Sequence, residues 1–303
     1  MNTSPKLLLV IVGPTAVGKT ALAIKLAKKY HTEIISADSR QFFREMSIGT
    51  AKPSIDELNK VTHHFINNIS ITEEYNAGKF EAEALLCMDD LFKTHNVVIM
   101  VGGSGLYIDA VCNGFDAMPE IDEEVRKELN TLYAEKGITA LQDQLLQLDP
   151  DHYNNVDLNN PQRIIRALEV CKSTGQAYSK FRKGEKKQRP FKIVKIGLNI
   201  DRELLYDRIN KRVDSMMQAG LLDEVKKLLP HQHLNALQTV GYSELFEHLQ
   251  GKTDLKTAIE KIKQNTRRFA KRQLTWFKRD AEIKWIEPNE KTLQVIEDLL
   301  VPN

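Results

Sequence analysis

The 303-residue sequence contains few cysteines, and these few form no recognisable pair. Cys87, Cys112 and Cys171 are far apart, and none belongs to a C-x-x-C motif, so the pattern supports neither a zinc site nor a disulfide framework. We therefore expect reduced, buried thiols and a cytoplasmic protein. Hydrophobic residues make up 42% of the chain, which is enough for a globular core that needs no such covalent support.

Long hydrophobic runs are also missing. No apolar stretch approaches the ~18 residues of a transmembrane helix, so we expect no membrane span. Residues 7–12 are apolar but lead directly into Gly13 and Pro14 without a cleavage-like site, which is unlike a signal peptide. The sequence has no internal repeat and no low-complexity segment, so solenoid and fibrous classes are not indicated.

The chain has little net charge, but its charges are unevenly distributed. The formal net charge is +2, yet residues 180–195 hold eight Lys or Arg and one Glu, and residues 252–279 hold ten Lys or Arg and two acids. Basic segments on a nearly neutral protein can form a binding surface for a phosphate backbone. Solvated helix faces are the alternative for either segment taken alone.

One motif for phosphate binding is complete. The octapeptide fits G-x-x-x-x-G-K-[ST] and comprises Gly13, Pro14, Thr15, Ala16, Val17, Gly18, Lys19 and Thr20. It lies between an apolar run and the amphipathic pattern of residues 21–30. In this context the glycines let backbone N–H groups face a diphosphate, Lys19 supplies a positive charge, and the Thr20 hydroxyl suits Mg²⁺. We therefore predict a P-loop.

Short apolar runs alternate with helical patterns along the chain. The predicted strands cover residues 7–12, 33–36, 97–101, 192–200 and 284–286. This alternation predicts an α/β fold, a P-loop NTPase-like parallel sheet with flanking helices. Residues 118–190 contain no apolar run that is typical of a buried strand, so we predict a helical insertion there. We divide the chain into a catalytic core over 1–117, an insertion domain over 118–190, and a second part of the core with C-terminal helices over 191–303.

Two strand ends bear on the chemistry. P-loop NTPases use an acid at a strand end to hold Mg²⁺ and position water, but the run at 97–101 is followed by Gly102, Gly103 and Ser104. This argues against routine nucleotide hydrolysis. Asp38 follows the second strand, and the carboxyl ends of parallel strands face the ligand crevice. Asp38 is therefore a candidate site residue, and capping of the next turn is its alternative role.

Several longer motifs resemble one family. Residues 36–53 (SADSRQFFREMSIGTAKP), together with GPTAVGKT, GGSGLYIDA, NNPQRIIRALEV and TRRFAKRQLTWF, resemble the tRNA dimethylallyltransferases, also called tRNA isopentenyltransferases. These motifs occur in order over nearly the whole chain. No cysteine follows Cys171, so the zinc-finger tail of eukaryotic relatives is absent, which is similar to the bacterial type.

The resemblance implies a reaction and its machinery. Enzymes of this kind transfer a dimethylallyl group from dimethylallyl diphosphate to N6 of adenine 37 beside the tRNA anticodon. The resemblance implies that Asp38 is the general base, and that Lys19, Thr20 with Mg²⁺ and Arg212 hold the diphosphate. A solvent-exposed helix charge is the alternative role for Arg212. We expect a monomer whose partners are tRNA and dimethylallyl diphosphate.

The resemblance also implies a set of tRNA contacts. These residues are Asp38, Ser39, Arg40, Gln41, Ser104, Arg126, Gln162, Arg163, Ile164, Ile165 and Arg166. Helix-surface charge is the alternative for Arg163 and Arg166. The apolar spacing in residues 255–277, which includes Phe269, predicts core positions, with the basic residues between them facing outward. We interpret His63 and His64 as packing or loop residues and not as metal ligands.

Two other classes of function remain open from the residues alone. A P-loop kinase of a nucleoside or small metabolite would also use the P-loop and the acid at a strand end. A non-catalytic RNA-binding module would use only the basic segments. The kinase predicts phosphoryl transfer from a nucleotide, and the module predicts RNA binding without modification of a base.

Overall fold

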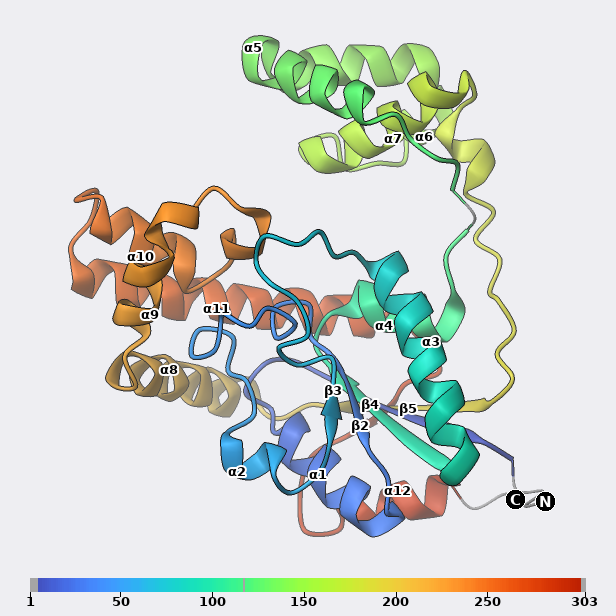
Figure 1. The fold of residues 1–303 in the computed structure, drawn as a ribbon, viewed down its shortest axis with the longest axis vertical. Helices are drawn as coiled ribbons and strands as arrows, with labels where there is room; N and C mark the ends of the chain where they lie inside the picture. Colours follow the sequence, from blue (N-terminus) through green and yellow to red (C-terminus); the bar gives the residue numbers. More distant parts are fainter. Residues whose placement is uncertain (1–4, 117, 301–303) are drawn as a thin grey trace. The chain divides into compact units, whose positions relative to one another are not determined.

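The computed structural model describes residues 5–116 and 118–300. It divides the chain into two compact units, unit 1 with residues 1–112 and 189–303, and unit 2 with residues 113–188. Residue 117, at the first internal boundary of our predicted division, lies outside the described residues, as do residues 1 and 303. Figure 1 shows the helices and strands of both units. Each unit has a hydrophobic core of its own.

Unit 1 is built on a parallel sheet of six strands in the order β3-β2-β4-β1-β5-β6. The strands are β1 (Leu7–Val12), β2 (Ile34–Ala37), β3 (His63–His64), β4 (Val97–Gly102), β5 (Lys192–Leu198) and β6 (Lys284–Ile286). The parallel α/β sheet predicted from the alternating pattern is confirmed. The apolar runs form strands because both faces of a parallel sheet are covered, so alternation with polar residues is not needed.

Helices cover both faces of this sheet. They are α1 (Lys19–Tyr30), α2 (Ile55–Leu58), α3 (Ala77–Thr94), α4 (Gly105–Asn113), α8 (Arg202–Gln218), α9 (Leu221–Leu228), α10 (Tyr242–Leu249), α11 (Leu255–Phe277) and α12 (Thr292–Leu300), with 3₁₀ turns at Leu229–His231 and Asn235–Leu237. Successive residues of β1 serve two cores: Leu8 and Val10 pack with α3 and α4, and Leu9 and Ile11 pack with α1, α8 and α12 (Figure 1). The central strand is thus fixed from both sides.

The topology determines where a ligand can approach. Strand β1 lies between β4 and β5, and β2 pairs with the other side of β4. Because these strands are parallel, the segments that follow β1, β2, β4 and β5 all leave the sheet at one edge. Loops at this edge carry ligand sites in open α/β sheets. The P-loop, Asp38 and the turn after β4 are therefore neighbours although they are far apart in sequence.

Unit 2 consists of helices around a small core. They are α5 (Glu123–Leu148), α6 (Pro150–Tyr153), α7 (Pro161–Thr174) and the 3₁₀ turn η1 (Tyr178–Phe181). Gly137 interrupts α5 with φ 74° and ψ −172°, a conformation that glycine adopts without a steric penalty. The core comprises Leu129, Leu141, Leu145, Ile164, Ile165, Ala167 and Leu168, all buried. The helical pattern of this region thus supports a separate core.

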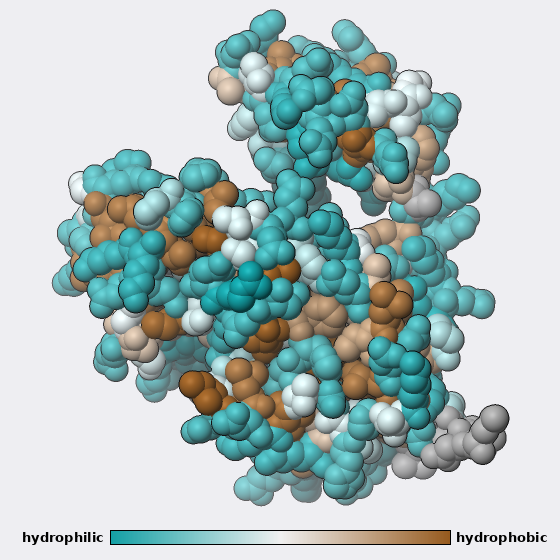
Figure 2. Space-filling model, viewed as in Figure 1, coloured by the Kyte–Doolittle hydropathy of each residue, from teal (hydrophilic) through white to brown (hydrophobic). Residues whose placement is uncertain are grey.

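Apolar side chains are gathered mainly inside each unit. The face of the surface in Figure 2 is largely hydrophilic, with apolar residues in small groups. Within residues 5–116 and 118–300, no helix combines the length and the apolar character that a membrane span requires.

Candidate active site

The P-loop connects β1 to α1 and contains three residues with positive φ. These are Gly13 (φ 140°), Ala16 (φ 65°) and Gly18 (φ 105°). Gly13 has a second constraint, because a Cβ there would lie 2.5 Å from the carbonyl oxygen of Leu198 in the neighbouring strand. A side chain at residue 13 would therefore separate β1 from β5. The loop curls tightly enough to present its backbone N–H groups beside the start of α1.

Lys19 is the first residue of α1 and lies over the loop. Its Nζ donates hydrogen bonds to the carbonyl oxygens of Gly13 (3.0 Å) and Pro14 (2.7 Å). Burial lowers the pKa of Lys19 to about 8, and the charge of Arg212 acts in the same direction while Asp38 opposes it. The ammonium is therefore a poorly solvated cation, which is favourable for binding a phosphate.

Asp38 directly follows β2. Its Oδ1 accepts a hydrogen bond from the backbone N–H of Arg40 at 3.1 Å, which is the turn-capping interaction that the sequence left open. Burial raises the pKa of Asp38 above its usual value, while that N–H group and the charges of Lys19 and Arg40 oppose the rise. The carboxylate thus combines a local capping role with an environment that makes it a stronger base.

A cavity of about 770 Å³ brings the predicted catalytic residues together. Lys19 and Thr20 of α1, Asp38, and Arg212 of α8 all line it. Arg212 Nη1 donates to the Thr15 hydroxyl at 3.4 Å, and burial lowers the pKa of this arginine. Arg212 is therefore held beside the P-loop, and the solvent-exposed alternative is wrong. The volume is in the range of small-molecule sites.

The turn after β4 contributes a hydroxyl and no carboxylate. Ser104 Oγ accepts a hydrogen bond from the backbone N–H of Ser39 at 2.9 Å and lies 3.1 Å from the Ser39 hydroxyl. The two strand ends are thereby tied together. A Cβ on Gly102 would lie 2.1 Å from the carbonyl oxygen of Ala37, so the glycine allows close contact between β4 and β2. The strand-end acid of an NTPase is absent here.

Arg40 and Gln41 are largely occupied by contacts within the protein. Arg40 Nη1 donates to the carbonyl oxygens of Asn235 and Ala236, each at 3.1 Å. Gln41 Nε2 donates to the carbonyl oxygens of Thr50 and Ala51, each at 3.2 Å. Both residues line the cavity, so their side chains shape its wall.

Gln273 of α11 links the P-loop to the turn after β4, a role that we did not predict for it. Its Oε1 accepts from the backbone N–H of Thr15 at 2.9 Å, and its Nε2 donates to the carbonyl oxygen of Gly103 at 3.0 Å. A Cβ on Gly103 would lie 2.2 Å from that Nε2 atom. The buried amide therefore explains Gly103. The sequence signal that could have indicated Gln273 is its position in the motif AKRQLTWF.

Glu224 of α9 is a second residue that sequence reasoning missed. Its carboxylate accepts hydrogen bonds from the backbone N–H groups of Ser47 (3.0 Å), Ile48 (2.8 Å) and Gly49 (3.1 Å). It also accepts the hydroxyl of the buried Tyr242 at 2.6 Å. The loop that carries Gly49, Thr50 and Ala51 into the cavity wall is thus anchored by one carboxylate. Only the tertiary fold brings these segments together.

The two adjacent histidines form strand β3, and their environments differ. His64 Nε2 pairs with the Glu33 carboxylate at 2.6 Å. His63 lines the cavity, and its Nδ1 contacts the carbonyl oxygen of Val61 at 2.9 Å. The Nε2 atom of His63 is buried without a hydrogen-bond partner, and burial lowers its pKa. His63 is therefore a neutral residue of the cavity wall, which corrects our interpretation of it as packing or loop. No group of three or more metal-ligating side chains occurs within the described residues.

The remaining predicted tRNA contacts lie in unit 2. Arg126 is engaged by the fully buried carboxylate of Glu169, which also lies 3.5 Å from Arg166 Nη1. Gln162 and Arg163 are exposed on α7. Ile164 and Ile165 are buried in the core of unit 2, so their side chains are not available to RNA. Helical spacing turns these two residues inward, and α7 offers its polar residues instead.

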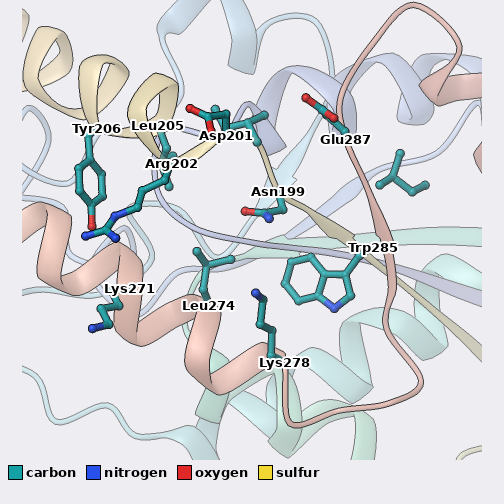
Figure 3. A pocket seen from close by; sticks show the side chains of 12 residues that line it. Asn199, Asp201, Arg202, Leu205, Tyr206, Lys271, Leu274, Lys278, Trp285 and Glu287 are labelled. Atoms are coloured by element: carbon teal, nitrogen blue, oxygen red, sulfur yellow. The ribbon is translucent and has the colours of Figure 1, made fainter.

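A second cavity, of about 560 Å³, contains none of the predicted site residues. It lies at the carboxyl ends of β5 and β6, and its lining residues come from these strand ends, from α8 and from α11 with the residue that follows it (Figure 3). Lys271 and Lys278 line it from α11 and its C-terminal end, and Trp285 lines it from β6. The chemistry of the P-loop and Asp38 therefore belongs to the first cavity alone.

The sequence is similar to a known protein family over most of its length. The model of the family described as IPP transferase matches residues 41–280. The chain belongs to the IPP transferase family. The chain is 56% identical over 287 residues to the tRNA dimethylallyltransferase of Christiangramia forsetii, covering 95% of each chain. It is 51% identical to tRNA dimethylallyltransferase 1 of Bacteroides thetaiotaomicron, covering 98% of this chain and 96% of the relative.

Solved structures of similar proteins share the fold of this chain. The tRNA isopentenylpyrophosphate transferase of Bacillus halodurans superposes with a TM-score of 0.73 at 38% identity, covering 97% of this chain and 95% of the other. A eukaryotic dimethylallyltransferase acting on tRNA superposes with a TM-score of 0.79 at 27% identity, covering 97% and 78%. Membership of the family and the missing strand-end acid weigh against the kinase alternative.

Proposed function

We propose that this protein moves a dimethylallyl group from dimethylallyl diphosphate to N6 of adenine 37, beside the anticodon of tRNA. The carbon–oxygen bond to the diphosphate breaks, and its electron pair leaves with the diphosphate. The N6 lone pair forms the new carbon–nitrogen bond, and the Asp38 carboxylate accepts the N6 proton. The observation that carries this proposal is that Asp38, Lys19, Thr20 and Arg212 line one cavity.

The leaving group is held by the P-loop in this proposal. The backbone N–H groups of the loop, the Lys19 ammonium and the Arg212 guanidinium stabilise the charge that develops on the diphosphate. The Thr20 hydroxyl and oxygens of the diphosphate are donors that Mg²⁺ prefers, so the residues present fit this ion. When bound, Mg²⁺ would further neutralise the leaving diphosphate.

The dimethylallyl group fits a wall of the cavity that lacks charge. The apolar residues along this wall are Val213, Met216, Leu221, Val240 and Ile262. They come from α8, α9, α11 and the segment before α10, and burying an alkyl chain there is favourable by about 25 cal/mol per Å² of apolar surface. The cavity thus offers an anion site and an apolar site, which is the combination that an isoprenoid diphosphate needs.

The acceptor base must leave its stack to reach this cavity. Extrusion costs about a few kcal/mol, and an unpaired loop base requires the least. We propose that Ser39 and Ser104 contact the base in unit 1, and that Gln162, Arg163 and Arg166 contact the RNA from unit 2. We also propose that the protein acts as a cytoplasmic monomer.

The test is the Asp38→Asn variant assayed with unmodified tRNA, Mg²⁺ and labelled dimethylallyl diphosphate. We expect kcat to fall about 10²- to 10⁴-fold with donor and tRNA affinities retained, since general-base assistance is of that size. Asp90→Asn is a matched control, because Asp90 is an exposed acid of α3 that pairs with Lys93 and lines neither of the two cavities. A nearly unchanged single-turnover rate in Asp38→Asn would contradict the role of Asp38. Labelled ATP in a parallel reaction tests phosphoryl transfer.

A further inference from the structure

One face of α11 forms a continuous wall of the first cavity. Its cavity residues are Ile262, Asn265, Thr266, Phe269, Arg272 and Gln273, a spacing of three and four that keeps them on one side of a helix. An α-helix rises about 1.5 Å per residue, so Phe269 is about 10 Å from the buried Ile262 along the helix axis. In the other direction it is about 6 Å along the axis from Gln273, which holds the P-loop. Phe269 therefore lies between the apolar wall and the diphosphate site.

Phe269 is not the core residue that helical spacing predicted. Its relative exposure is 39%, and among the described residues it joins none of the three hydrophobic clusters. The other aromatic residues of the helix, Trp276 and Phe277, do pack into the first cluster. The prediction failed because the cavity opens beside this turn of α11, so the helix face that should meet the core meets solvent there.

The exposed ring of Phe269 has a cationic side chain, Arg272, beside it. The guanidinium carbon of Arg272 lies 5.8 Å from the centroid of the Phe269 ring. Arg272 is one turn further along α11 and lines the same cavity. Aromatic rings and guanidinium planes are the two surfaces on which proteins stack unpaired nucleobases, and a nearby cation also suits a phosphate.

We propose that Phe269 and Arg272 form a stacking site for an unpaired nucleobase of the RNA loop. The identity of the RNA rests on the proposed function, but the stacking contact itself does not require the transfer reaction. A base held here would lie within one or two helical turns of the P-loop and would keep the loop open beside Asp38. The helix α11 thus binds the acceptor with the same face that anchors the P-loop.

The position of Phe269 favours a base over the dimethylallyl group. The apolar wall already supplies buried surface, and Leu221 and Ile262 within it are nearly inaccessible to solvent. Phe269 is instead partly open to water and adjacent to a charge. A short alkyl chain gains little from such a site, whereas the face of a base and its phosphate match a ring and a guanidinium.

The experiment uses RNA hairpins with 2-aminopurine at one anticodon-loop position at a time, because stacking quenches its fluorescence. The full chain is titrated without donor, and we expect quenching at one position for the native protein. Phe269→Ala should lose that quenching and weaken RNA affinity about tenfold or more, as base–aromatic stacking predicts. Phe269→Trp should retain both.

Matched variants separate stacking from packing. Phe269→Leu keeps apolar volume without a ring and should behave like Phe269→Ala. Leu204→Ala removes an exposed apolar side chain of α8 outside both cavities and should have no effect. Native-like affinity in Phe269→Leu, or a raised KM for dimethylallyl diphosphate with unchanged RNA affinity, would overturn the stacking site. Quenching without dimethylallyl transfer would instead overturn only the proposed function.

Discussion

At the scale of single residues, the site depends on two groups whose environments shift their pKa values in opposite directions. Burial lowers the pKa of Lys19 and raises that of Asp38. Each group partly offsets the other, because the ammonium and the carboxylate attract. Both shifts have the same main cause, which is the loss of solvation in a shared cavity. They move both pKa values toward neutral pH.

We expect a bell-shaped pH dependence of kcat/KM for dimethylallyl diphosphate. As the pH rises through about 8, Lys19 of the free enzyme loses its proton and becomes neutral. The diphosphate then has one cationic partner fewer, so kcat/KM falls. As the pH falls through the raised pKa of Asp38, the carboxylate becomes protonated and cannot accept the N6 proton, so kcat/KM falls again.

The measurement is steady-state kinetics from acid to alkaline pH, with the ionisation of the free donor titrated separately. Asp38→Asn should flatten the acidic limb of its residual activity and leave the alkaline limb in place. An alkaline limb that is absent up to pH about 10 would contradict the assignment to Lys19, whose ordinary pKa is near that value.

At the scale of elements, the cavity wall depends on contacts between segments rather than on any one loop. Glu224 of α9 holds residues 47–49 through three backbone N–H groups. Gln41, which follows β2, holds the carbonyl oxygens of Thr50 and Ala51 in the same loop. The loop is therefore fixed from two sides, and its conformation is set by its neighbours.

We expect Glu224→Gln to lower the free energy of unfolding by about 2 kcal/mol, because an uncharged amide replaces the carboxylate beside three donors. Tyr242→Phe removes one hydrogen bond to that carboxylate and should cost about 1 kcal/mol. Both should reduce kcat/KM for tRNA. Urea denaturation and kinetics measure these effects. Asp223→Asn is the matched control, since Asp223 is an exposed neighbour whose nearest ion-pair partner is Lys226 at 3.4 Å. Equal stability of Glu224→Gln and native protein would contradict the anchoring role.

At the scale of the whole molecule, the chain leaves and re-enters unit 1 at nearly one point. Arg189, the first residue after unit 2, donates to the carbonyl oxygens of Val111 (2.8 Å) and Ala110 (2.9 Å) and to Glu81 at 2.7 Å. The Arg189 side chain thus joins the segment where the chain leaves unit 1 to the segment where it returns. Unit 2 has its own core, so neither unit needs the other for burial.

We expect a chain in which a short Gly-Ser linker replaces residues 113–188 to fold cooperatively and bind pyrophosphate as the full chain does. It should lose at least about tenfold in tRNA affinity, because the cations of unit 2 are gone. Calorimetry with pyrophosphate and filter binding with tRNA measure this. The same shortened chain with Lys19→Ala is the control and should not bind pyrophosphate. Unchanged tRNA affinity would contradict an RNA-binding role for unit 2.

Local signals were sufficient for the anion site and for every strand except the two-residue β3, whose histidines we interpreted as packing or loop residues. The apolar run before Gly13 and the eight-residue P-loop are contiguous, so their spacing alone predicts their geometry. Asp38 could be placed at the same sheet edge because parallel strands end together. Helical spacing failed at Phe269, since periodicity reports which side of a helix a residue faces and not what that side meets.

The sequence by itself thus determined the apolar strands β1, β2, β4 and β5, the P-loop and the acid after β2, because each depends on residues that are adjacent in the chain. Only the tertiary structure decided that Gln273 bridges Thr15 and Gly103, that Glu224 anchors residues 47–49, and that Phe269 is open to solvent. The physical reason is that these contacts join segments far apart in sequence. A hydrogen bond between them exists only once the sheet and helices have packed.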